Sequence, residues 1–257
     1  MTTPPGELGR TQQTGFGPLT RAYWYCGRTI VRIFAGVFYR VRLSGFENVP
    51  PAGAFIVAAN HQSHFDPPMV GLVISHRRPF RSIARSGLFK FKPFAWLIAA
   101  FGAIPVVRGK GDTAAMKAAL AELGRGRPIL IFPEGSRTDN GQIGEFMRGI
   151  TVLLKRAQAP VVPAAIEGAL EVWPRTRAFP RFTGRIAVHL APAIQPDVLL
   201  KDGPDAALEM LRRTIEHERL QLRSWLRRET GGTYPPHGPG DSPYWEHMPA
   251  EVNVASN

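Results

Sequence analysis

Two polar clusters in this chain hold side chains of the types that acid–base chemistry requires. The first is Asn60-His61-Gln62-Ser63-His64-Phe65-Asp66, which directly follows the apolar run 55–59. If a turn brings His61 and Asp66 together, the carboxylate can accept a hydrogen bond from one ring nitrogen and leave the other as a general base. No Gly-x-Ser-x-Gly, the usual setting of a nucleophilic serine, occurs in the chain, so the attacking hydroxyl would come from the substrate. Taken alone, this spacing more often marks a surface turn with a solvated histidine.

The second cluster, Phe132-Pro133-Glu134-Gly135-Ser136-Arg137-Thr138, also follows a short apolar run, 129–131. It combines an acid, a glycine, two hydroxyl groups and an arginine within a few residues. Arginine binds phosphate through paired, charge-assisted hydrogen bonds, so this composition suits a phosphate with neighbouring hydroxyl groups. The alternative is an ordinary turn that continues through 139–141.

Apolar runs with strand character alternate with helical patterns along most of the chain. The predicted strands are 54–59, 81–84, 104–107, 129–132, 161–166 and 186–190, and the predicted helices are one after Asp66, then 88–101, 112–123, 149–157 and one that begins at Pro204. This alternation predicts an α/β fold, a single domain around a mostly parallel central sheet. Ligands bind at the carboxyl ends of strands in such sheets, where the first cluster is expected.

A helical pattern precedes this domain. Its apolar residues Tyr23, Ile30, Val31, Phe34, Val37 and Phe38 fall on one face, with Arg21, Arg28 and Arg32 opposite. The pattern fits a helix packed on the domain and also a helix lying at a membrane interface. The expected organisation is a flexible tail over 1–18, an amphipathic membrane-interface helix over 19–40, the α/β domain over 41–229 and a flexible tail over 230–257.

The charge of the chain indicates a polyanionic partner. Its 32 Lys and Arg exceed its 20 Asp and Glu, a net charge of +12, which suits an anionic membrane or nucleic acid. Between Asp66 and Asp112 no acidic residue occurs, and the basic residues Arg77, Arg78, Arg81, Arg85, Lys90, Lys92, Arg108 and Lys110 are interleaved with large apolar ones from Phe80 to Trp96. This mixture favours a membrane face beside the site. No nucleic-acid-binding motif supports the other partner.

The expected location is peripheral, on the cytoplasmic face of the cell membrane. The first residues show no basic cluster followed by an apolar stretch, so no signal peptide is predicted. The longest uncharged run, 93–107, contains two prolines and is shorter than the roughly 20 apolar residues of a spanning helix. The single cysteine, Cys26, cannot form an internal disulfide, which is compatible with a reducing compartment.

Four blocks in order, 60–66, 102–108, 132–137 and 162–166, resemble those of the glycerolphosphate and lysophospholipid acyltransferases, the family typified by 1-acylglycerol-3-phosphate acyltransferase. Ser136 stands where that family usually has threonine. The resemblance implies an acyltransferase domain over 41–229, with His61 and Asp66 as the catalytic pair. It also implies that the acceptor phosphate and glycerol are bound by Arg108, Glu134, Gly135, Ser136 and Arg137.

The implied reaction moves a fatty acyl chain from acyl-CoA or acyl carrier protein to a hydroxyl of 1-acylglycerol-3-phosphate. The implied partners are this thioester donor, the lysophospholipid acceptor and an anionic membrane surface, with no nucleic acid, no metal and no cofactor besides the donor. One alternative is another lysophospholipid or lipid acceptor. A remote alternative is a metallohydrolase with His61, His64, Asp66 and Glu134 as ligands, because His-x-x-His spacing can serve a metal.

Overall fold

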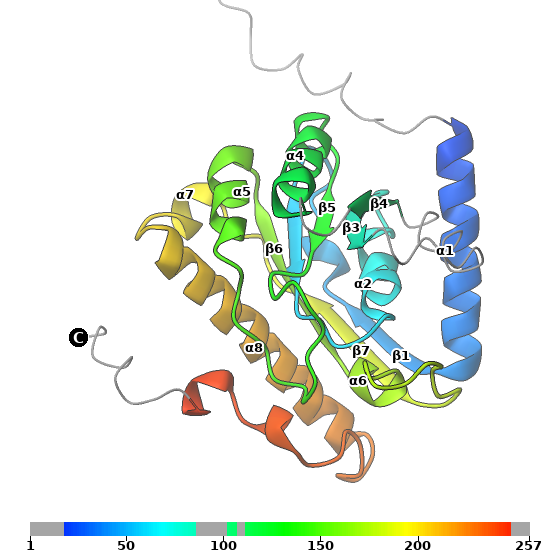
Figure 1. The fold of residues 1–257 in the computed structure, drawn as a ribbon. Helices are drawn as coiled ribbons and strands as arrows, with labels where there is room; N and C mark the ends of the chain where they lie inside the picture. Colours follow the sequence, from blue (N-terminus) through cyan, green and yellow to red (C-terminus); the bar gives the residue numbers. More distant parts are fainter. Residues whose placement is uncertain (1–17, 86–101, 107–110, 248–257) are drawn as a thin grey trace, which may run out of the picture.

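The computed structural model describes residues 18–85, 102–106 and 111–247, which form a seven-stranded sheet between two layers of helices (Figure 1). The strands are β1 (Arg40–Ser44), β2 (Ile56–Ala59), β3 (Arg81–Arg85), β4 (Ala103–Val106), β5 (Ile129–Ile131), β6 (Val161–Glu167) and β7 (Arg185–Leu190). The helices are α1 (Pro18–Phe38), α2 (Asp66–Ile74), α4 (Gly111–Gly124), α5 (Gly149–Ala157), α6 (Ala169–Val172), α7 (Pro196–Leu199) and α8 (Pro204–Arg228). Short 3-10 helices are η1 (Phe46–Asn48), η3 (Pro239–Asp241) and η4 (Tyr244–His247).

The strand order is β1-β7-β6-β2-β5-β3-β4. Strands β6, β2, β5, β3 and β4 run parallel to one another, β7 is antiparallel to β6, and β1 is parallel to β7. The predicted α/β fold with a mostly parallel sheet is therefore confirmed. Because neighbouring parallel strands end at one edge, the residues that follow β6, β2 and β5 come together there.

Both faces of the sheet are covered, which explains why β2 is a continuous apolar run. Val57 and Ala59 belong to the core shared with α1 and α2, whereas Ile56 and Ala58 belong to the core shared with α4, α5 and α8. Figure 1 shows these two groups of helices on opposite sides of the sheet. All four β2 side chains are fully buried, so β2 provides a fixed base for the turn that follows it.

Most predicted elements are present, and helices α5 and α8 begin at the predicted residues. Helix α4 begins one residue before the predicted start. The sequence interpretation missed β1, whose residues Arg-Val-Arg-Leu-Ser are exposed or half-buried at the edge of the sheet. The predicted helix 88–101 lies outside the described residues. Within the described part of the chain, no helix has the length and apolarity to span a bilayer.

Helix α1 packs on the domain through a face that differs from the predicted one. Trp24, Val31 and Ala35 are buried, and Trp24 meets the Phe80 ring edge-on at 6.0 Å between centroids. Ile30 and Val37, predicted to share the packed face with Val31, are instead exposed. The difference arises because a small alanine and a tryptophan fit against α2 and the sheet, which leaves an aliphatic stripe on the outer side.

The predicted positive face beside the site is wrong for its first residues. Arg81 begins β3 and thus lies at the amino edge of the parallel sheet, opposite the edge where β2 ends. Its Nε donates to Glu122 at 3.3 Å, and Arg78 donates to two backbone carbonyl oxygens. Phe80 is fully buried, and 86–101 lie outside the described residues. The sequence interpretation missed Glu122 as the partner of Arg81 because Glu122 lies in α4, 41 residues further along the chain.

The prediction of a flexible tail from residue 230 is wrong for residues 230–247, which pack against α8. Tyr244 is buried, and Asp241 Oδ1 accepts hydrogen bonds from Arg223 Nε at 2.6 Å and Arg227 Nη2 at 2.5 Å. The Tyr234 hydroxyl lies 2.8 Å from the carbonyl oxygen of Gly168, the residue after β6. Glycine and proline content suggested disorder, whereas buried contacts to helix α8 fix this segment.

We expect Tyr234→Phe to lower the free energy of unfolding by about 1 kcal/mol, because it removes a half-buried hydroxyl that lies within hydrogen-bond distance of two carbonyl oxygens, those of Gly168 and Arg185. The melting temperature should fall by roughly 2–4 °C. Tyr25→Phe, on the exposed side of α1, is the matched control and should melt like wild type. Equal melting temperatures for both variants would show that the Tyr234 hydroxyl contributes no stability.

Candidate active site

Three central strands end next to one another, and each supplies one part of the candidate site. The His61 turn follows β2, the Glu134 loop follows β5, and Glu167 is the last residue of β6. The Asn60 side chain fixes β2 to β6 at this edge: Nδ2 donates to the Ile166 carbonyl oxygen at 2.9 Å, and Oδ1 accepts from the Ile166 N–H at 2.8 Å. The expectation that the first cluster lies at the carboxyl end of a strand is met.

His61 and Asp66 form the pair that the spacing suggested. His61 Nδ1 lies 2.7 Å from Asp66 Oδ2, and the same oxygen accepts the backbone N–H groups of Gln62 at 2.5 Å and Ser63 at 2.6 Å. Asp66 is fully buried at the first position of α2. Burial raises the pKa of its carboxyl group, while the bond to His61 and the two N–H groups oppose that shift because they favour the charged form.

The His61 ring is held on its other side by Phe132. The two rings stack at 4.1 Å between centroids with planes 21° apart, and the His61 side chain is 19% exposed. Among the described residues, no hydrogen bond engages Nε2. A histidine with Nδ1 bound to a carboxylate and Nε2 left for a ligand has the arrangement of a general base.

Glu134 supports the turn from the neighbouring loop. Its Oε1 accepts the His61 N–H at 2.7 Å and its Oε2 accepts the Gly144 N–H at 2.8 Å. Burial raises the pKa of Glu134 to about 7, and the charge of Asp66 adds to the shift. The Thr138 N–H donates to the His61 carbonyl oxygen at 2.8 Å. Both peptide groups of His61 are thus held by the second cluster.

Gly135 has a backbone that other residues would adopt with strain. Its φ is +67°, and a Cβ there would lie 2.6 Å from Met147 Sδ. Ser136 is exposed and Arg137 half-buried. With Glu134, they line a cavity of about 350 Å³, whose wall also includes Thr138 and Asn140. The structure therefore brings together four of the five residues expected to bind the acceptor; Arg108 lies outside the described residues.

His64 has a different environment from His61. Its ring lies 5.0 Å from that of Trp173, and burial, followed by the charges of Arg137 and His61, lowers its pKa to about 4. His64 is therefore uncharged at neutral pH. The positive charge of the nearby Arg137 contributes to the lowering of its pKa. Within the described ranges, no group of three or more His, Cys, Asp or Glu residues could hold a metal ion.

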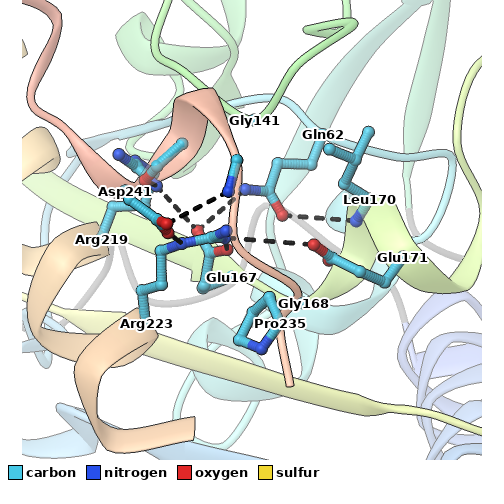
Figure 2. A network of polar contacts seen from close by, with 12 residues as sticks. Gln62, Gly141, Glu167, Gly168, Leu170, Glu171, Arg219, Arg223, Pro235 and Asp241 are labelled. Carbon is cyan, nitrogen blue, oxygen red and sulfur yellow. Dashed lines mark hydrogen bonds and ion pairs between the residues drawn. The ribbon is translucent and has the colours of Figure 1, made fainter. Parts of the chain in front are cut away.

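The sequence interpretation missed the residues that hold the turn from the side of β6. Gln62 Nε2 donates to Glu167 Oε2 at 3.0 Å, and both residues are fully buried (Figure 2). One available signal was the composition of β6, an apolar strand that ends in an acid. A charge at the end of a buried strand requires partners, and these come from α8.

Comparison with known proteins relates this site to a family. The family model described as Acyltransferase matches residues 40–167. A 1-acyl-sn-glycerol-3-phosphate acyltransferase of Pseudomonas aeruginosa is 31% identical over 189 residues, 72% of this chain and 68% of that protein. A chloroplastic enzyme of the same name from Arabidopsis thaliana is 25% identical over 166 residues, 62% of this chain but only 45% of the relative, so the chain spans under half of its length.

The solved structure of the 1-acyl-sn-glycerophosphate acyltransferase PlsC from Thermotoga maritima has a similar fold, with a TM-score of 0.60 and 25% identity over 77% of this chain and 79% of that one. The matched family model includes the His61 turn, the Glu134 loop and Glu167. The Pseudomonas aeruginosa relative is 31% identical and is covered over 68% of its length, and the family model and the fold agree with it. The chain therefore belongs to the acyltransferase family that includes the 1-acyl-sn-glycerol-3-phosphate acyltransferases.

Proposed function

We propose that this protein transfers a fatty acyl chain from an acyl thioester, acyl-CoA or acyl carrier protein, to the free hydroxyl of 1-acylglycerol-3-phosphate. The product would be phosphatidic acid, a precursor of membrane phospholipids. The observation that carries the proposal is the 2.7 Å contact of His61 Nδ1 with the buried Asp66 carboxylate, beside a cavity lined by Arg137. The names of the matched relatives supply the substrate class.

In the proposed mechanism, His61 Nε2 takes the proton of the acceptor hydroxyl as its oxygen attacks the thioester carbonyl carbon. Asp66 holds the ring by Nδ1 and stabilises the imidazolium that forms. The tetrahedral intermediate then breaks its carbon–sulfur bond, and the departing thiolate receives the proton from the imidazolium. The new ester bond forms directly between acceptor and acyl group, so no acyl-enzyme is required.

Arg137 is proposed to hold the phosphate of the acceptor. Its guanidinium is near enough to the His64 ring to lower that ring's pKa, which puts a positive charge beside the catalytic turn. Arg137 and Ser136 both line the 350 Å³ cavity. A phosphate bound there would present the glycerol hydroxyl to a base on the adjacent strand end. Arg108 is proposed as a second phosphate ligand on the resemblance alone.

A peripheral membrane location is proposed from the exposed apolar side chains at the catalytic edge. Helix α1 leads into β1 at that edge, and its end carries exposed Val37 and Phe38. The Phe38 ring lies 5.5 Å from that of Phe182, and Phe182 and Phe179 are exposed on the loop before β7. Apolar side chains among basic ones suit a headgroup layer, and they would bring the site to a lipid substrate.

We expect His61→Ala to lower kcat on the order of 10²–10⁴-fold without unfolding the protein, because the base acts in the transition state. Asp66→Asn should be nearly as damaging, since a neutral amide cannot stabilise the imidazolium that forms on His61. His64→Ala is the matched control and should have a mild effect. Acyl transfer from labelled acyl-CoA measures all three. Turnover retained without His61, or equal loss from both histidine variants, would contradict the mechanism.

We expect Arg137→Ala to raise the acceptor KM by roughly 10- to 100-fold, because a charge-assisted phosphate contact contributes about 1.5–3 kcal/mol. Arg156→Ala, an exposed arginine on α5, is the control. The assay compares 1-acylglycerol-3-phosphate, lysophospholipids with larger headgroups, and monoacylglycerol, which has no phosphate. The difference between variant and wild type should vanish with monoacylglycerol. Unchanged acceptor kinetics with weakened donor binding would instead assign Arg137 to the thioester's carrier.

We expect Phe179→Ser with Phe182→Ser to reduce cosedimentation with anionic phospholipid vesicles several-fold. Val198→Ser with Met210→Ser is the control, because both of these residues are also exposed but lie on α7 and α8. Binding of wild type should weaken with salt yet persist in part, since only its electrostatic share is screened. Equal binding of the two double variants would remove the loop before β7 from the membrane face.

A further inference from the structure

Glu167 is a buried carboxylate held from three directions. Its Oε2 accepts Gln62 Nε2 at 3.0 Å and Arg219 Nη1 at 3.1 Å, and its Oε1 accepts Arg223 Nη1 at 2.5 Å. Glu167 and Arg219 are fully buried and Arg223 is 5% exposed. Figure 2 shows the acid between the Gln62 amide on one side and the two guanidinium groups of α8 on the other.

The two arginines are themselves fixed by the segment after α8. Arg219 Nη1 also donates to the Gly240 carbonyl oxygen at 2.9 Å, and its remaining nitrogens bind Glu216 at 2.7 and 2.9 Å. Arg223 Nε donates to Asp241 Oδ1 at 2.6 Å, and its Nη2 to the Pro236 carbonyl oxygen at 2.8 Å. The guanidinium forks leave these side chains little freedom, so Glu167 has a fixed position.

The charges of this network balance without any group from the catalytic turn. The carboxylates of Glu167, Glu216 and Asp241 face the guanidinium groups of Arg219, Arg223 and Arg227. A further acid, Glu171, lies 4.0 Å from Arg223, and burial with the charge of Glu167 raises its pKa to about 7. Gln62 is uncharged, so its contact adds a hydrogen-bond donor to Glu167 and does not alter this charge balance.

Gln62 lies between the catalytic turn and this network. Its backbone N–H donates to Asp66 Oδ2, the oxygen that binds the His61 ring. Its side chain points away from Asp66: Nε2 donates to Glu167 Oε2, and Oε1 accepts the Leu170 N–H at 3.4 Å. Gln62 thus connects the histidine–carboxylate pair to the network, because its backbone N–H binds Asp66 and its side chain binds Glu167.

We propose that Glu167 is a positioning residue of the acyl-transfer site: it holds the Gln62 side chain, and through it the turn that presents Asp66 to His61, while Arg219, Arg223 and segment 234–244 hold Glu167. The inference rests on the proposed function for its activity assay. It assigns α8 and the C-terminal segment, both outside the match to the family model over 40–167, a part in the geometry of catalysis.

The test uses Gln62→Met, which keeps the length of the side chain and removes both of its hydrogen bonds. Glu167 keeps its two arginine contacts in this variant, so the network stays charge-balanced. We expect kcat to fall on the order of 10- to 100-fold, as for small misplacements of a catalytic group, with the acceptor KM changed less than twofold. Gln221→Met, exposed on α8, is the matched control and should equal wild type.

A second variant separates positioning from packing. Asp241→Asn loosens Arg223 from the far side of the network and should lower kcat several-fold. Combined with Gln62→Met it should lower kcat no further, because the connection is already cut; independent effects would multiply. Multiplying effects, or full kcat in Gln62→Met, would overturn the inference.

A third readout needs no activity. In Gln62→Met, hydrogen exchange at the backbone amides of residue 62 and Ser63, the two N–H donors to Asp66, should speed up several-fold while the amides of β2 keep their protection. Unchanged exchange would overturn the inference. If wild type proved inactive with every lysophospholipid and donor, the proposed function would fail, and the exchange measurement would still decide the positioning role.

Discussion

The buried carboxylate of Asp66 is the constraint on which the rest of the site depends. A charge removed from water must find hydrogen-bond donors nearby, and Asp66 finds them in the His61 ring and two N–H groups of its own turn. This requirement fixes the conformation of residues 60–66. The same contacts orient the His61 ring, so the hydrogen bonds that satisfy the buried acid also align the histidine.

Two further carboxylates hold this turn, one from each neighbouring strand. Glu134 follows β5 and binds the His61 N–H, and Glu167 ends β6 and binds the Gln62 side chain. Parallel strands make this possible, because β6, β2 and β5 end side by side. An acid is costly to bury at these strand ends, and replacing a buried ion pair by well-packed apolar residues is often neutral or even stabilising. Such cost favours a role in holding geometry over a role in stability alone.

The proposed membrane face and the proposed catalytic pair, His61 and Asp66, lie at the same edge of the sheet. Helix α1 reaches that edge at its carboxyl end, where its outer aliphatic stripe continues into Phe182 of the loop before β7. In the proposed function, His61, the cavity lined by Arg137 and the apolar side chains would serve a substrate whose reacting group lies next to its lipid chain. Arg81 and Phe80, at the opposite edge, have structural partners instead.

Sequence alone determined the alternation of strands and helices, the polar clusters after β2 and β5, and the pairing of His61 with Asp66, because each depends on local spacing. It could not determine the packed face of α1, the packing of residues 230–247 or the hydrogen-bond partners of Glu167. Those features depend on partners far along the chain. Trp24 packs against Phe80, and Glu167 forms ion pairs with Arg219 and Arg223. Periodicity shows which residues can be buried, whereas only the tertiary structure decides which neighbours bury them and which charges they meet there.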